Sequence, residues 1–234
     1  MKFGRLLFEM LLFFLVFFLP GYLSQSAITA NRAYGTSAML QSILIGAPQF
    51  LLMVYIVTVA QAGDLQEWGF IPLSWSDALR IVVLLAVFFG ALLLFAAFLP
   101  PRWAKYLSGG FRWRLSGPSQ IPVAVVFGLV AGYREEFFFR SYLLKRFETL
   151  GFPVVLSIAL STIVFCLGHL YEGRLGLATS VVLGVIFAAV YTRRRSVHVI
   201  AIAHGLYNAI VLCLSLLHTP PLSALGEIGT FITR

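Results

Sequence analysis

The sequence predicts an all-α membrane protein, a polytopic bundle of about seven transmembrane helices that encloses a polar chamber. The first observation is composition. Of the 234 residues, 60% are hydrophobic and 11% are charged, whereas about a quarter of a soluble domain is charged. The second is the recurrence of apolar runs of about 20 residues, the length that a helix needs to cross a bilayer. The third is a set of charged, imidazole and amide side chains inside three of these runs.

Seven apolar segments are interpreted as spans. The first follows Met-Lys-Phe-Gly-Arg, which also fits a secretory signal, but Glu9 within the run and the lack of an Ala-x-Ala site favour a retained anchor. Gly151, Phe152 and Pro153 are expected to turn the chain between the fourth and fifth segments. The segments are 6–30, 39–60, 80–99, 121–144, 154–170, 175–192 and 197–217.

We expect three parts along the chain: N-terminal membrane helices and loops over 1–119, a core with the polar residues over 120–218, and a tail over 219–234. The net charge is +8. In a membrane protein such an excess of basic residues is explained by loops that contact anionic head groups. We therefore expect the lipid bilayer as a partner, and no nucleic acid. Cys166 and Cys213 both lie in apolar segments and form neither a disulfide framework nor a metal motif.

The fourth segment carries four charged residues, Arg134, Glu135, Glu136 and Arg140. One such side chain at bilayer depth costs about 2.5–3.5 kcal/mol, so four facing lipid would cost roughly 10 kcal/mol. They must therefore face the protein interior and pair. Glu136 and Arg140 are four apart on one helix face, the favourable order for an ion pair. Glu135 is rotated by about 100° from Glu136 and must point at another partner.

Polar side chains recur in the fifth and seventh segments. Glu135 lies sixteen residues before Gly151, and His169 lies sixteen residues after Pro153, so antiparallel helices would hold both about 24 Å from the turn. His204 and Asn208 are four apart on one face of the last segment and need partners if buried. The depth of His204 agrees less well with that of Glu135, unless a helix tilts or the fourth helix extends past the membrane.

Small residues accompany these polar groups and permit close approach of membrane helices. They are Gly128, Gly132, Gly168 and Gly205.

Three motifs resemble, in order, those of the CPBP family, the CAAX protease and bacteriocin-processing (Abi) intramembrane endopeptidases, which include the type II CAAX prenyl endopeptidases. The similarity covers roughly residues 120–215. The motifs are Glu-Glu-x-x-x-Arg at Glu135–Arg140, Phe-x-x-x-His at Phe165–His169 and His-x-x-x-Asn at His204–Asn208.

The resemblance implies an endopeptidase that cleaves a membrane-associated peptide or protein, in the bacterial cytoplasmic membrane. It implies that Glu135 and His169 activate a water molecule, that His204 and Asn208 stabilise the oxyanion, and that Arg140 with Glu136 supports the site. A carboxylate and an imidazole for proton transfer, with fixed donors where charge develops, suffice for peptide hydrolysis. The resemblance does not indicate a particular substrate or oligomeric state.

Alternatives remain for the cofactor and for the function. Zinc held by Glu135, His169 and His204 is possible chemically, but His-Glu-x-x-His is absent, and a zinc site would leave no obvious separate oxyanion donor. We therefore favour a metal-free site with no cofactor. The alternative functions are a non-catalytic bacteriocin-immunity or scaffold protein of the same fold and a proton-coupled secondary transporter, although the internal repeats typical of transporters are not found.

Overall fold

A computed structural model describes residues 2–23, 35–98, 100 and 115–217. Within these ranges every regular element is a helix, which confirms the all-α fold class. The predicted tail over 219–234 lies outside the described residues.

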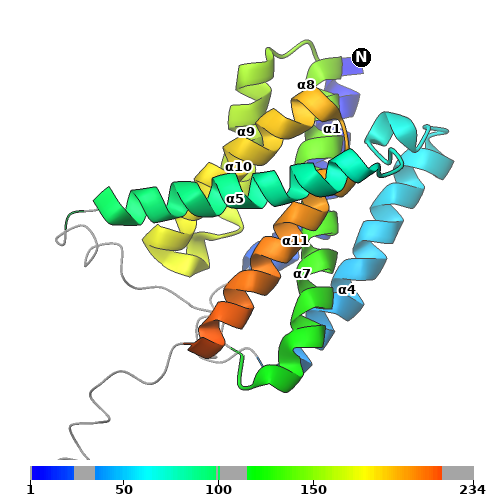
Figure 1. Cartoon of the computed structure of the whole chain (residues 1–234). Helices are drawn as coiled ribbons and strands as arrows, with labels where there is room; N and C mark the ends of the chain where they lie inside the picture. The colour runs from blue at the N-terminus through cyan, green and yellow to red at the C-terminus, as the bar shows by residue number, and fades with distance from the viewer. Residues whose placement is uncertain (1, 24–34, 99, 101–114, 218–234) are drawn as a thin grey trace, which may run out of the picture.

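Each of the seven apolar segments forms a helix over most of its described residues (Figure 1), while residues 24–30 of the first segment and 99 of the third lie outside them. Several consist of two or three consecutive elements. The elements are α1 (Lys2–Phe17) with α2 (Leu19–Leu23), α4 (Thr36–Tyr55) with the π-helical turn η1 (Ile56–Ala60), α5 (Trp75–Phe98), α7 (Ile121–Glu136) with the π-helical turn η4 (Phe137–Tyr142) and α8 (Leu143–Thr149), α9 (Val154–Leu167), the 3₁₀ turn η5 (Leu170–Glu172) with α10 (Gly173–Arg194), and α11 (Val197–Leu214).

The prediction of seven spans is not confirmed. In the described part of the chain, four helices are long and apolar enough to cross a membrane. Of the other three, α1 has 16 residues and α9 has 14, which is short of the roughly 20 that a bilayer requires. The helix over 121–149 is longer but contains the charged residues of the polar cluster. The four candidate spans are Thr36–Ala60, Trp75–Phe95, Leu170–Arg194 and Val197–Leu217.

The helix from α7 through η4 to α8 runs without a break over 121–149 and carries the charged residues of the site. Pro122 lies in its first turn, where the missing N–H is not needed. All six residues of η4 are buried, and π-helical turns are frequent at functional sites. The chain turns after α8 at Gly151, as the sequence analysis predicted. Its φ of +78° is a conformation that glycine adopts readily. The helix ends five residues beyond the predicted limit of 144.

The helices pack as a bundle in which α7 lies between α4 and α11, and α9 lies against α10. Helix α5 contacts α10 and α11 and crosses in front of them in Figure 1, while α1 lies behind α7 and α8. The buried core is rich in aromatic side chains. For example, the rings of Phe18 and Phe138 stack with centroids 4.4 Å apart, which fixes the N-terminal helices against η4.

Glycines bring α7 and α11 into backbone contact. A Cβ atom added to Gly128 would overlap the carbonyl oxygen of Gly205, and one added to Gly132 would overlap the carbonyl oxygen of Ala201. The close helix approach expected from the small residues is therefore confirmed for this pair.

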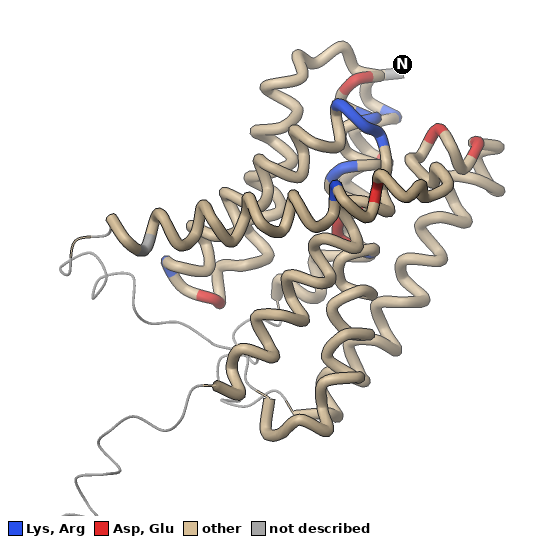
Figure 2. The backbone as a smooth tube through the Cα atoms, in the orientation of Figure 1, with Lys and Arg blue, Asp and Glu red and all other residues tan. Residues whose placement is uncertain are grey.

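The charged residues are distributed unevenly along the bundle (Figure 2). The chain is free of Lys, Arg, Asp and Glu throughout α4 and α11 and from 121 to 133 in α7. The end that holds the N-terminus and α8 carries three ion pairs: Arg146 to Glu9 at 2.6 Å, Lys145 to Glu67 at 2.9 Å and Arg195 to Glu148 at 3.0 Å. The charges of the candidate site lie between this polar end and the apolar remainder.

Candidate active site

Glu136 and Arg140 form a buried ion pair at the junction of α7 and η4. Nη1 of Arg140 donates to Oε1 of Glu136 at 3.0 Å, and both side chains are 0% exposed. The pair expected from their spacing is thus present. Removal of either residue would leave the other charge buried without its partner, which strongly destabilises a folded protein.

His204 of α11 contacts the same carboxylate oxygen. Its Nδ1 atom lies 2.7 Å from Oε1 of Glu136, and its side chain is 3% exposed. Since a carboxylate only accepts, Nδ1 must carry the proton of this hydrogen bond. The sequence did not predict this contact. His204 nevertheless reaches the depth of the acidic pair, and the fourth helix does extend beyond its expected end.

Glu135 has a different environment from Glu136. Its side chain is 16% exposed, and its Oε2 lies 3.9 Å from Nε2 of His204. Nη2 of Arg134 approaches Oε1 at 3.4 Å. His169 and Arg140 also lie within electrostatic range of this carboxylate. Glu136 is therefore enclosed by two donors, whereas Glu135 is the more accessible acid and lies among both imidazoles.

His169 lies where α9 ends. Its Nδ1 is 3.0 Å from the carbonyl oxygen of Phe165. Because a carbonyl oxygen only accepts, Nδ1 carries a proton, which leaves the lone pair of a neutral ring on Nε2. The aromatic ring of Phe165 packs against His169 with centroids 4.4 Å apart, and Cζ of Arg140 lies 4.3 Å from the centre of that ring. Phe165 thus links His169 to the buried ion pair.

Asn208 follows His204 by one turn of α11 and is half-buried. No hydrogen bond of its side chain is found within the described residues, so its amide is not committed to a protein group there. Three buried atoms of the ion pair are also without a hydrogen-bond partner in the described part of the chain: Oε2 of Glu136 and both Nε and Nη2 of Arg140. The site therefore retains capacity to bind water or a substrate group.

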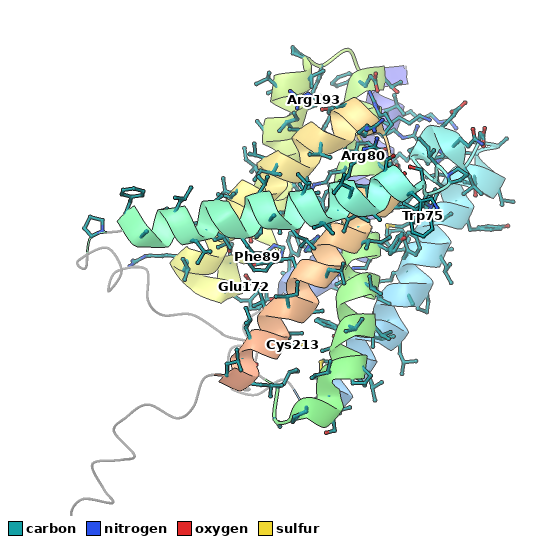
Figure 3. The ribbon with its side chains drawn as sticks, in the orientation of Figure 1. Trp75, Arg80, Phe89, Glu172, Arg193 and Cys213 are labelled. Carbon is teal, nitrogen blue, oxygen red and sulfur yellow. The ribbon has the colours of Figure 1, made fainter. Side chains whose placement is uncertain are left out.

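Glu172 is a third carboxylate of the site and was not among the predicted residues. It ends η5, is half-buried, and interacts electrostatically with His169, Glu135 and His204. Figure 3 shows it in the turn that precedes α10, below α5 in that view. It is the one acidic residue between 154 and 192, and an isolated acid at the edge of an apolar segment was a signal that could have identified it.

Zinc held by Glu135, His169 and His204 stays an alternative to the metal-free site. No group of three or more His, Cys, Asp or Glu side chains is placed to hold a metal ion among the residues that the structure describes. Nδ1 of His204 bonds to Glu136, so only its Nε2, which lies 3.9 Å from Oε2 of Glu135, could bind a metal. Metal dependence stays a prediction that an experiment must test.

Comparison with known families supports the resemblance. Residues 117–210 match the family described as type II CAAX prenyl endopeptidase Rce1-like. The match contains all three motifs and bears out the resemblance that they indicated. Comparisons with curated proteins and with solved structures gave no match. The matched family is a protease family, and with four apolar helices the chain is an integral membrane protein.

Proposed function

We propose that this protein is an intramembrane endopeptidase that hydrolyses a peptide bond of a membrane-associated peptide or protein in the bacterial cytoplasmic membrane. The observation that carries the proposal is the position of Glu135 of α7: its Oε2 lies 3.9 Å from Nε2 of His204 of α11, and it lies within electrostatic range of His169 at the end of α9. An acid and two imidazoles from three helices, within an apolar bundle, are costly to bury unless they act together.

In the proposed reaction, a water molecule binds between Glu135 and Nε2 of His169. Glu135 accepts one proton of this water as its oxygen attacks the carbonyl carbon of the peptide bond, which produces a tetrahedral oxyanion. The lone pair on Nε2 of His169 accepts a hydrogen bond from the water and so orients it. Glu135 then delivers the proton to the leaving nitrogen as the carbon–nitrogen bond breaks, and the free carboxylate and amine are the products.

The oxyanion requires donors that are in place before it forms. Asn208 can donate from its side-chain amide. His204 already uses its Nδ1 proton on Glu136, so Nε2 can donate to an oxyanion only when the ring carries both protons. Glu136 thus sets which nitrogen of His204 faces Glu135, and Arg140 holds Glu136 in place.

The test compares the membrane peptides of a deletion strain complemented with the wild type, with Glu135→Gln or with His169→Asn. Peptides that the wild type shortens identify a substrate, which is then cleaved by purified protein in liposomes. Both variants should lose at least about 10²-fold in kcat while remaining folded. Glu148→Gln, which changes an exposed acid of α8, is the matched control and should cleave normally. No cleavage by the wild type would refute the proposal, and normal cleavage by either site variant would refute its assigned role.

A further inference from the structure

The N-terminal helices α1 and α2 reach the candidate site, although they lie outside the segment that matches the family. Cζ of Arg134 lies 5.3 Å from the ring centre of Phe18. Tyr22 of α2 lies within electrostatic range of Glu135. Its ring and its hydroxyl both contact the end of α9, the helix that presents His169.

At the end of α9 the N–H of Gly168 does not make the bond that a regular α-helix would give it. The N–H of Gly168 bonds to the carbonyl of Phe165 at 3.1 Å, and the N–H of His169 bonds to that of Cys166 at 3.0 Å. Both bonds span three residues, so the final turn is tightened. In a regular α-helix the N–H of Gly168 would bond to the carbonyl of Val164. That carbonyl therefore needs a partner, because an unsatisfied backbone group in an apolar environment costs several kcal/mol.

Tyr22 supplies this partner. Its hydroxyl donates to the carbonyl oxygen of Val164 at 2.8 Å, a contact between residues 142 positions apart. The side chain thus caps a helix to which it does not belong. The tightened turn then leads directly into His169, whose Nδ1 also bonds within it, to the carbonyl of Phe165.

The ring of Tyr22 also lies against the backbone just before His169. A Cβ atom added to Gly168 would be 2.7 Å from Cε1 of Tyr22 and 3.0 Å from its Cζ and hydroxyl oxygen. Such distances are too short for unstrained contact, so glycine at 168 is what lets the ring approach. The ring therefore limits how far the turn can move towards α2, while the hydroxyl holds it in place.

We infer that Tyr22 is a positioning residue for His169: it caps the end of α9 and thereby holds the imidazole at its working distance from Glu135. This inference rests on the proposed endopeptidase function. Small displacements of a reacting group are expensive, since about 1 Å can cost 10²-fold in rate. Tyr22 of α2 thus takes part in a site whose other residues all lie within 117–210, the segment that matches the family.

The first experiment measures kcat and KM for Tyr22→Phe, which keeps the ring and removes the donor. We expect kcat to fall about tenfold with KM unchanged, because the turn loosens but the substrate still binds. Tyr142→Phe is the matched control: it removes a buried hydroxyl that donates to Glu9 at 2.8 Å, beside the ion pair of Glu9 and Arg146. A wild-type kcat in Tyr22→Phe, or an equal fall in Tyr142→Phe, would overturn the inference and leave the endopeptidase proposal standing.

The second experiment needs no substrate and so separates the two proposals. Gly168→Ala is introduced into the wild type and into Tyr22→Ala, and the thermal unfolding of all four proteins is compared. The added methyl should lower Tm when Tyr22 is present and have much less effect when its ring is absent, since contacting residues couple. Equal effects of Gly168→Ala in both backgrounds would show that Tyr22 does not hold this turn and would refute the inference.

Discussion

Nδ1 of His204 lies 2.7 Å from Oε1 of Glu136, and this hydrogen bond joins α11 to α7 at the centre of the candidate site. The same oxygen accepts from Arg140 at 3.0 Å. One carboxylate thus holds a guanidinium of its own helix and an imidazole of another. Glu136 consequently has two effects: it neutralises Arg140, and it determines that Nε2 is the nitrogen of His204 that faces Glu135.

Removal of Arg140 should destabilise the protein. Arg140→Ala leaves Glu136 charged, fully buried and with His204 as its remaining partner, and breaking such a pair costs on the order of 3–5 kcal/mol. We expect a lower Tm and a lower yield of folded protein in detergent. Arg195→Ala, which removes a half-exposed pair with Glu148, should leave Tm nearly unchanged. A wild-type Tm for Arg140→Ala would contradict the importance of the pair.

The glycine contact between α7 and α11 should be needed for both stability and activity. In Gly132→Ala the new methyl overlaps the carbonyl of Ala201, so the helices must separate and the bond between His204 and Glu136 must lengthen. Overpacking of this kind costs about 1–3 kcal/mol. Gly90→Ala is the control, because nothing lies within 4 Å of a Cβ added there. Equal Tm and kcat for the two variants would show that the close approach is dispensable.

Asn208 and His204 should differ in what their removal affects. Asn208→Ala breaks no hydrogen bond known within the described residues, so Tm should stay near the wild-type value. If its amide stabilises the oxyanion, kcat should fall by about 10²–10³. His204→Ala removes a buried partner of Glu136 and should lower both Tm and kcat. Parallel measurements of unfolding and kcat test this. An Asn208→Ala enzyme with normal kcat would remove Asn208 from the reaction.

Glu172 should influence the rate through its charge. Glu172→Gln keeps the shape of the side chain and removes a negative charge that interacts with His169 and His204. Any positive charge that develops on these imidazoles during the reaction then loses stabilisation. We expect kcat to fall about tenfold, which corresponds to about 1.4 kcal/mol of lost transition-state stabilisation, with Tm retained. Glu67→Gln, at a largely exposed acid, is the comparison. Equal kcat values in both variants would exclude Glu172.

Activity should withstand metal removal. Because no metal-holding cluster is placed among the described residues, incubation of the purified protein with a strong chelator, followed by its removal, should leave kcat unchanged. Added zinc should not increase it. Loss of activity with the chelator and recovery with zinc, and not with magnesium, would overturn the metal-free mechanism. It would also require Glu135, His169 and His204 to rearrange on binding.

Composition and local spacing were sufficient for several of these conclusions. The all-α membrane class follows from the apolar fraction, and the places of the seven helices follow from runs of apolar residues, because both depend on residues that are near one another in the chain. The same holds for the pair of Glu136 and Arg140, which belongs to a single helix. The order of the motifs was enough to indicate the family.

The contacts between helices could not be read from the chain alone. That His204 bonds to Glu136, that Glu172 joins the site and that Tyr22 caps α9 depend on how helices cross, and crossing is set by packing over many side chains. The prediction of seven spans is not confirmed for a related reason. An apolar run does not fix how many of its residues are helical: α9 has 14 helical residues, fewer than the roughly 20 that a bilayer requires. Helix formation is a local property, whereas the meeting of polar groups is a property of the assembled bundle.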